Sequence, residues 1–230
     1  MKNLLKIIIG FSLINLFGCA AYITKEEFAP KMYIEKPISI LVLPPMNNST
    51  AADAKDYYIT TVAEPLTNSG YYVYPMEIVN DILQQEGLYD TETMLNAPLN
   101  KFKEYFGADA VLYVTIQEWD TQYFVTSGSV NVKAKCELKS TMSGEVIWFY
   151  DDRISVNTSG ANVGGGWLGL LTQVVTTAVQ TAATDYVPIA RDVNKNIFLA
   201  LPDGKYNPGF NKDQKDKIKK KDPVKNKSNN

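Results

Sequence analysis

Ile38-Ser-Ile-Leu-Val-Leu43 is a nearly continuous run of β-branched and apolar residues, and Pro44 and Pro45 end it. A run that is apolar at successive positions is typical of a strand buried on both faces of a sheet. We therefore expect a central strand here, and we expect the folded domain to begin near Pro37.

Downstream of this strand, helical spacing and strand-like alternation follow one another. The expected helices cover residues 51–68, 76–85, 100–106, 167–184 and 188–201, and the expected strands cover residues 71–74, 110–119, 123–141 and 145–155. The last three strands are joined closely enough for an antiparallel three-strand meander, which follows a β-α-β-α-α start. We predict one α+β domain with a mixed sheet and C-terminal helices over residues 37–202.

Charge is distributed unevenly. The chain has a net charge of -2, but residues 211–230 carry eight lysines and three aspartates, and the body from Cys19 to Phe210 carries -9. Apolar periodicity ends after Pro202, so we expect residues 203–230 to be a disordered, lysine-rich tail. An acidic body with a basic tail argues against a nucleic-acid partner.

Residues 1–18 have the pattern of a bacterial lipoprotein signal peptide. Lys2 and Lys6 precede an apolar run over residues 7–14 that is too short to span a bilayer. The segment that follows matches a lipobox, with a bulky residue in its second position: Leu16, Phe17, Gly18 and Cys19. We expect cleavage after Gly18, and we expect residues 19–36 to form a lipidated tether without regular structure.

Cys19 would carry a diacylglycerol on its sulfur and an N-acyl chain such as palmitate, and two or three chains together hold a protein firmly at a membrane. Ala20 replaces the aspartate that retains enterobacterial lipoproteins at the inner membrane. We therefore expect the inner leaflet of the outer membrane, facing the periplasm. An ordinary secretory signal with a chance cysteine is the alternative.

Histidine is absent from the sequence. This removes Ser/His and Cys/His nucleophile pairs and the commonest metal ligand, so we expect no metal and no cofactor besides the lipid on Cys19. Cys136 lies in a strand pattern of alternating apolar residues, and we expect it to be a buried structural thiol rather than a reactive one.

The meander concentrates aromatic and acidic residues. Its aromatic residues are Tyr113, Trp119, Tyr123, Phe124, Trp148, Phe149 and Tyr150. Its carboxylates and those beside it are Asp109, Glu118, Asp120, Asp151 and Asp152. We expect the aromatic residues to pack and the carboxylates to be solvated, with a glycan-stacking platform and an acid/base pair as the alternatives.

A glycine-rich segment precedes the expected helix 167–184. It contains Gly164, Gly165, Gly166, Trp167, Leu168 and Gly169. It lacks the lysine of a phosphate-binding loop. Two interpretations remain open, namely a hinge before a helix that packs in the core or in an oligomer, and an apolar surface that meets a partner or lipid.

Several segments together resemble a family of bacterial lipoproteins known as domain of unknown function 799. Besides the lipobox and the glycine-rich segment, they are residues 37–50, Gly70-Tyr-Tyr-Val-Tyr-Pro75, Pro98-Leu-Asn-Lys101 and Phe106-Gly-Ala-Asp-Ala-Val-Leu-Tyr113. The resemblance implies a fold like the amino-terminal domain of TolB, which the secretion lipoprotein CsgG shares, and a CsgG-like lipoprotein as partner. It brings no catalytic residues.

These observations predict a non-enzymatic lipoprotein subunit of an envelope transport or secretion assembly. The glycine-rich segment would be its interaction surface, and the protein could form a homo-oligomer. A lipoprotein that regulates a peptidoglycan-synthesis enzyme is the alternative, and a glycan hydrolase that uses acidic residues is a third hypothesis.

Overall fold

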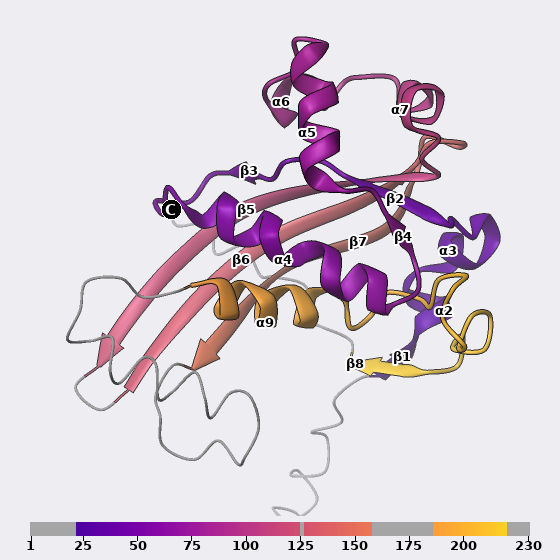
Figure 1. The fold of residues 1–230 in the computed structure, drawn as a ribbon. Coiled ribbons are helices and arrows are strands. Elements are labelled where there is room, and N and C mark those ends of the chain that lie inside the picture. The colour runs from indigo at the N-terminus through magenta and orange to yellow at the C-terminus, as the bar shows by residue number, and fades with distance from the viewer. Residues whose placement is uncertain (1–21, 125–126, 158–185, 220–230) are drawn as a thin grey trace, which may run out of the picture.

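The computed structural model describes residues 22–124, 127–157 and 186–219 (Figure 1). Its strands are β1 Tyr22–Thr24, β2 Ser39–Val42, β3 Met46–Asn47, β4 Tyr72–Val73, β5 Ala110–Phe124, β6 Ser127–Ser140, β7 Val146–Asn157 and β8 Lys217–Lys219. Its helices are α2 Lys25–Phe28, α3 Pro30–Glu35, α4 Ala54–Asn68, α5 Met76–Gln85, α6 Thr91–Met94, α7 Leu99–Phe106 and α9 Val187–Phe198.

The main sheet is mixed, with the strand order β4-β2-β5-β6-β7 and with β3 paired to β5. Strands β4, β2 and β5 run parallel, whereas β5, β6 and β7 are antiparallel. All four residues of β2 are buried. The predictions of an α+β fold and of a central buried strand are confirmed.

Alternate residues of β2 point into two different cores. Ile40 and Val42 belong to a core that α4 and α9 cover, together with Tyr58 and Val193. Leu41 and Leu43 belong to a second, smaller core, which α5, α6 and α7 cover. Helices therefore cover both faces at β2, while only one face of β6 and β7 contributes to a core. This explains why β2 is apolar from Ile40 onward, whereas apolar and polar residues alternate in β6.

The turn between β5 and β6 differs from our prediction. We expected Tyr123 to start the second strand of the meander, but β5 continues to Phe124, which pairs with Ser127. The alternating pattern runs through both strands, so period alone does not locate the turn. The short elements β3 and α6 were also not predicted.

The prediction of an irregular tether is wrong for residues 22–35, which form β1, α2 and α3. Thr24 and Glu27 make a capping box at the start of α2, in which each side chain accepts a hydrogen bond from the other residue's backbone N–H. Ala29 and Met32 are buried in the larger core. This cap and these two buried residues help to order a segment that has little periodicity, together with the pairing of β1 with β8.

The prediction of a disordered tail is wrong for residues 203–219. The N–H of Gly204 donates to the Ser69 carbonyl at 2.7 Å, and β8 pairs antiparallel with β1. Gly70 has a φ of +85°, and a Cβ on it would lie 2.3 Å from the Asn207 nitrogen. Only glycine allows this close approach, so Gly70 is the residue that lets the C-terminal segment dock.

Candidate functional site

The predicted lipidation site and the predicted interaction segment both lie outside the described part of the chain. These are Leu16, Phe17, Gly18 and Cys19 of the lipobox, and Gly164, Gly165, Gly166, Trp167, Leu168 and Gly169. The structure does describe the elements that flank these two segments in the sequence. Strand β1 begins three residues after Cys19, and the glycine-rich segment lies between the end of β7 and the start of α9.

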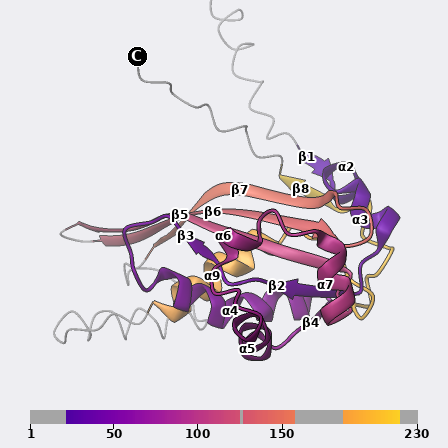
Figure 2. The same cartoon turned by 90° about the horizontal axis from the view of Figure 1, so that it is seen from above.

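These two places lie at opposite ends of the molecule. The Ser143 hydroxyl in the β6–β7 turn donates to Glu35 at the end of α3, the helix that follows β1 and α2, at 2.8 Å. From that turn β7 runs for 12 residues, roughly 40 Å, to its end at Asn157. Figure 2 shows the β1–β8 ribbon near the beginning of β7 and far from the opposite end of β5 and β6. Attachment at Cys19 would therefore leave the other end of the sheet far from the attachment point.

A cluster that we call the terminal clasp joins the two ends of the described chain. It consists of Lys25, Asp203 and Asp213. The Lys25 Nζ lies 2.9 Å from Asp213 Oδ2 and 3.6 Å from Asp203 Oδ1. The Asp203 N–H also donates to Asp213 Oδ2, at 2.8 Å, and Asp213 is only 3% exposed. The clasp is therefore a buried ion-pair network between segments about 180 residues apart.

The clasp has one cation for two carboxylates. Partial burial raises the pKa of Asp203; the charge of Asp213 adds to this effect, and Lys25 opposes it. Tyr33 lies beside the clasp, and burial, followed by the charge of Asp213, raises the pKa of its hydroxyl. The Tyr33 hydroxyl and Asp213 Oδ1 are both buried. Lys25 is thus the counter-charge on which the clasp depends.

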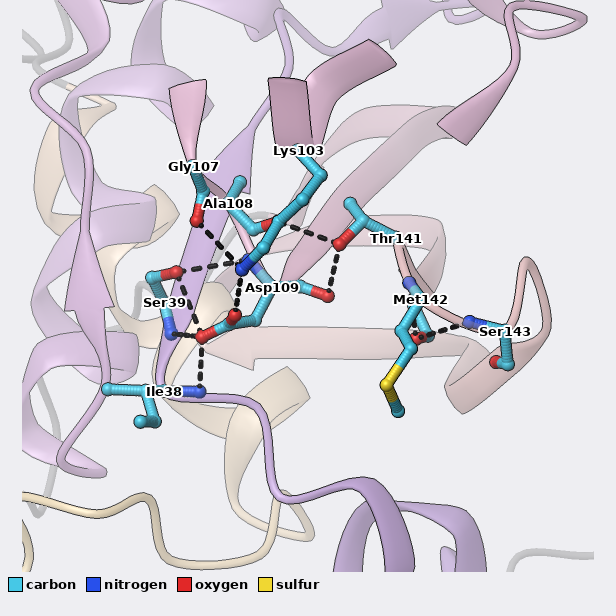
Figure 3. A network of polar contacts seen from close by, with 10 residues as sticks. Ile38, Ser39, Lys103, Gly107, Ala108, Asp109, Thr141, Met142 and Ser143 are labelled. Carbon is cyan, nitrogen blue, oxygen red and sulfur yellow. Dashed lines mark hydrogen bonds and ion pairs between the residues drawn. The ribbon is translucent and has the colours of Figure 1, made fainter. Parts of the chain in front are cut away.

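Asp109, one of the predicted carboxylates, has a structural role (Figure 3). Its Oδ2 accepts hydrogen bonds from the N–H groups of Ile38 and Ser39 at 3.0 and 3.1 Å, and its Oδ1 lies 2.6 Å from Lys103 Nζ. The Asp109 N–H donates to Ser39 Oγ, and its carbonyl accepts from Thr141. This side chain fastens the beginnings of β2 and β5 to the end of α7.

Partial burial pushes the pKa of Asp109 up, but hydrogen bonds from Lys103, Ile38 and Ser39 outweigh burial, so its pKa is lowered. We expect Asp109→Ala to reduce the free energy of unfolding by about 2–3 kcal/mol at neutral pH. A lowered folded-state pKa stabilises above the unfolded value and loses that effect as pH falls through the folded value. The deficit of the variant in denaturant unfolding should therefore shrink in acid. An equal deficit at both pH values would contradict this assignment.

The other predicted carboxylates do not form one site with Asp109. Glu118 lies nine residues further along β5, roughly 30 Å away, and forms an ion pair with Arg153. Asp120 is exposed. Within residues 22–124, 127–157 and 186–219, no three His, Cys, Asp or Glu side chains lie close enough together to hold a metal ion. The acid/base pair of the hydrolase hypothesis gains no geometric support here.

The aromatic residues of the meander mostly pack in the core. The buried ones are Tyr113, Trp119, Trp148 and Tyr150. The Trp148 ring stacks on Phe198 with centroids 5.4 Å apart, which fastens α9 to β7. Phe149 is 43% exposed, and the side chains of Tyr123 and Phe124 lie outside the described residues. The expectation of packing is confirmed for the four buried rings.

Cys136 is fully buried in β6, as predicted. Its Sγ lies 3.6 Å from the Tyr58 hydroxyl, and burial raises the pKa of the thiol to about 12. A thiol that stays protonated at neutral pH is a poor nucleophile. Cys136 is therefore a structural residue.

Among the described residues, no helix packs on one face of β6 and β7. The outward-facing residues are Lys133, Lys135, Glu137 and Lys139 on β6 and Phe149, Asp151 and Arg153 on β7. Among the described strands, none pairs with the outer edge of β7. An unpaired edge can accept a strand from another chain, although the charges of Asp151 and Arg153 oppose indiscriminate pairing.

No helix within the described ranges has the length and apolar character needed to cross a membrane.

Comparisons with known proteins identify relatives of this chain. A family model described as "Putative lipoprotein GNA1162-like" matches residues 31–205. A Neisseria meningitidis serogroup B relative, "Putative lipoprotein NMB1124/NMB1162", is 33% identical over 150 residues, which are 65% of this chain and 69% of the relative. These matches leave Lys25 and Asp213 of the terminal clasp outside the family model, whereas Asp203 lies within it.

Solved structures also resemble it. The crystal structure of lipoprotein GNA1162 from Neisseria meningitidis is 31% identical, has a TM-score of 0.50, and covers 64% of this chain and 100% of its own. A PelC dodecamer from Paraburkholderia phytofirmans is 15% identical, has a TM-score of 0.44, and covers 74% of this chain and 90% of its own. The match thus covers the whole GNA1162 crystal chain but only about two thirds of this chain.

Proposed function

Because this chain belongs to the GNA1162-like family of lipoproteins, we propose that it is a lipid-anchored, non-enzymatic subunit of an assembly in the bacterial envelope. Cys19 is the acylated residue, and the inner leaflet of the outer membrane, facing the periplasm, is its location. The partner that we propose is another envelope lipoprotein of the CsgG-like type, which the family resemblance implies, or a second copy of this chain.

The observation that carries this proposal is the separation between the two ends of the sheet. Strand β1 starts three residues after Cys19, whereas β7 leads away from that end toward the glycine-rich segment. A protein held at one end presents the other end to the periplasm. The end of β7, the start of α9 and the outer edge of β7 would then face the periplasm, and we propose that a partner binds at this end through the Gly164–Gly169 segment.

Cross-linking before extraction tests this proposal. A photoreactive residue at Trp167 should give adducts with another envelope lipoprotein, or with a second copy, in a defined stoichiometry after extraction in mild detergent. The matched control carries the same residue at Tyr89, which is 70% exposed and lies between α5 and α6. Mass spectrometry of the adducts identifies the partner.

The adducts also separate the competing functions. Adducts with a peptidoglycan synthase would replace the assembly subunit by a regulator of that enzyme. Monomer alone at both positions would refute the assembly. Turnover of cell-wall fragments that is lost on changing Glu118 or Asp120 would refute the non-enzymatic role.

A further inference from the structure

The end of the β1–β8 ribbon closest to Cys19 combines one exposed aromatic side chain with lysines. Antiparallel pairing places Tyr22 opposite Lys219 and Thr24 opposite Lys217. Residues directly opposite each other in such a pair project from the same face. Tyr22 is 60% exposed, and both lysines are exposed, so all three are presented to solvent.

Positive charge is concentrated at one end of the ribbon. Lys219 lies at the end where β1 begins, and the next two residues of the sequence are also lysines, Lys220 and Lys221. At the opposite end the charges are mixed, because Lys25 precedes Glu26 and Glu27 after β1, and Lys215 accompanies Asp216 before β8. Within the described ranges, neither Lys217 nor Lys219 has a carboxylate within ion-pair distance. The basic end is therefore the one nearer to Cys19.

The chain between Cys19 and Tyr22 is short. Three residues span at most about 10 Å, which is also about the distance over which exposed charges act at physiological salt. Acylation at Cys19 would thus hold Tyr22 and Lys219 within reach of phospholipid headgroups. Tyrosine rings and lysine ammonium groups are the side chains that suit this interfacial region.

We propose that Tyr22, Lys217 and Lys219 form a membrane-contact surface that binds anionic phospholipid headgroups beside the lipid anchor. This inference rests on the proposed acylation of Cys19. The surface adds a second, electrostatic attachment to the acyl chains and limits how the domain can turn about its anchor. It thereby orients β7 away from the bilayer.

Lysine acetylation of the acylated full chain in vesicles tests this surface. In vesicles that contain phosphatidylglycerol, Lys217 and Lys219 should react several-fold more slowly than in phosphatidylcholine vesicles. Lys205, which is exposed in the same C-terminal segment, should react equally in both and serves as the internal control. Raising the ionic strength to about 1 M shortens the Debye length to about 3 Å and should remove the protection.

A pair of charge-reversal variants supplies the second measurement. K217E/K219E should reduce cross-linking to a photoreactive anionic lipid headgroup several-fold, whereas K205E/K212E should leave it unchanged. The inference would be overturned if anionic vesicles protected Lys217 and Lys219 no more than Lys205. It would also be overturned if both double variants cross-linked equally. If the chain does not float with vesicles at all, the proposal that Cys19 is acylated is refuted instead. The experiment therefore distinguishes failure of the anchor from failure of the membrane-contact surface.

Discussion

Cys19→Ser is expected to abolish acylation and signal-peptide processing together. Serine lacks the thiolate that accepts the diacylglycerol, and the lipoprotein peptidase requires that modification before it cuts after Gly18. Each buried methylene contributes about 0.8 kcal/mol to membrane attachment, so loss of two or three chains removes most of it. The expected result is no labelled palmitate on the chain and a mass that retains residues 1–18.

The only other cysteine provides the matched control. Cys136→Ala changes a thiol that is buried and whose pKa is raised, so it should leave acylation and processing unchanged. Palmitate labelling and mass are the deciding measurements, because an uncleaved apolar leader could itself retain the serine variant in a membrane fraction. Labelled palmitate on Cys19→Ser would refute the anchor.

Lys25→Met is expected to open the terminal clasp. It leaves Asp203 and Asp213 buried together without a cation, and removing one partner of a buried ion pair typically costs about 3–5 kcal/mol. The free energy of opening the clasp should fall by that amount. If the clasp is less stable than that, it should open completely. Hydrogen exchange of the Lys25 and Glu26 amides, which donate to Asp216 and Gln214, measures the opening.

Lys31→Met is the control for this variant. Lys31 and Glu145 form an ion pair of the same 2.9 Å length, but both side chains are largely exposed, and such pairs contribute at most about 1 kcal/mol. Lys25→Met should therefore open the clasp far more than Lys31→Met. Equal exchange in the two variants would contradict the role given to Lys25.

The pH dependence and a double variant sharpen the clasp prediction. Burial already raises the pKa of Asp203 and Lys25 opposes this effect, so without Lys25 the folded-state pKa of Asp203 should lie further above its unfolded value of about 3.9. A raised pKa stabilises below the unfolded value, and that stabilisation is lost as pH rises through the folded value, so the variant should be least impaired in acid. Adding Asp213→Asn to Lys25→Met removes one unpaired charge and should restore part of the loss.

Local patterns predicted most of the secondary structure. Residues 76–85 coincide with α5, and Gly107 ends α7 in the left-handed conformation that favours glycine. The pattern of β6 identified Cys136 as buried before its contact with Tyr58 was known. These features succeed because helix caps and period-two burial depend on neighbouring residues. The Thr24-x-x-Glu27 capping box was a local signal of the same kind, and it could have revealed α2.

The terminal clasp has no comparable signal. Lys25 and Asp213 are 188 residues apart, and neither lies in an apolar pattern. A lysine-rich, polar segment normally cannot bury enough apolar surface to order itself. Here it is ordered because Gly70 lets its backbone approach and because Asp213 meets a buried cation, and both conditions exist only in the folded domain.

The sequence by itself determined the class of the fold, the buried central strand and the cysteine expected to carry the lipid, because each depends on residues close together in the chain. Only the tertiary structure showed that both ends of the domain are ordered and joined to each other. It also showed that Asp109 has a structural rather than a catalytic role, and that the β1–β8 ribbon lies far from the end of β7. The physical reason is that the partners of a buried charge and the ends of a sheet are set by long-range packing, which no local period records.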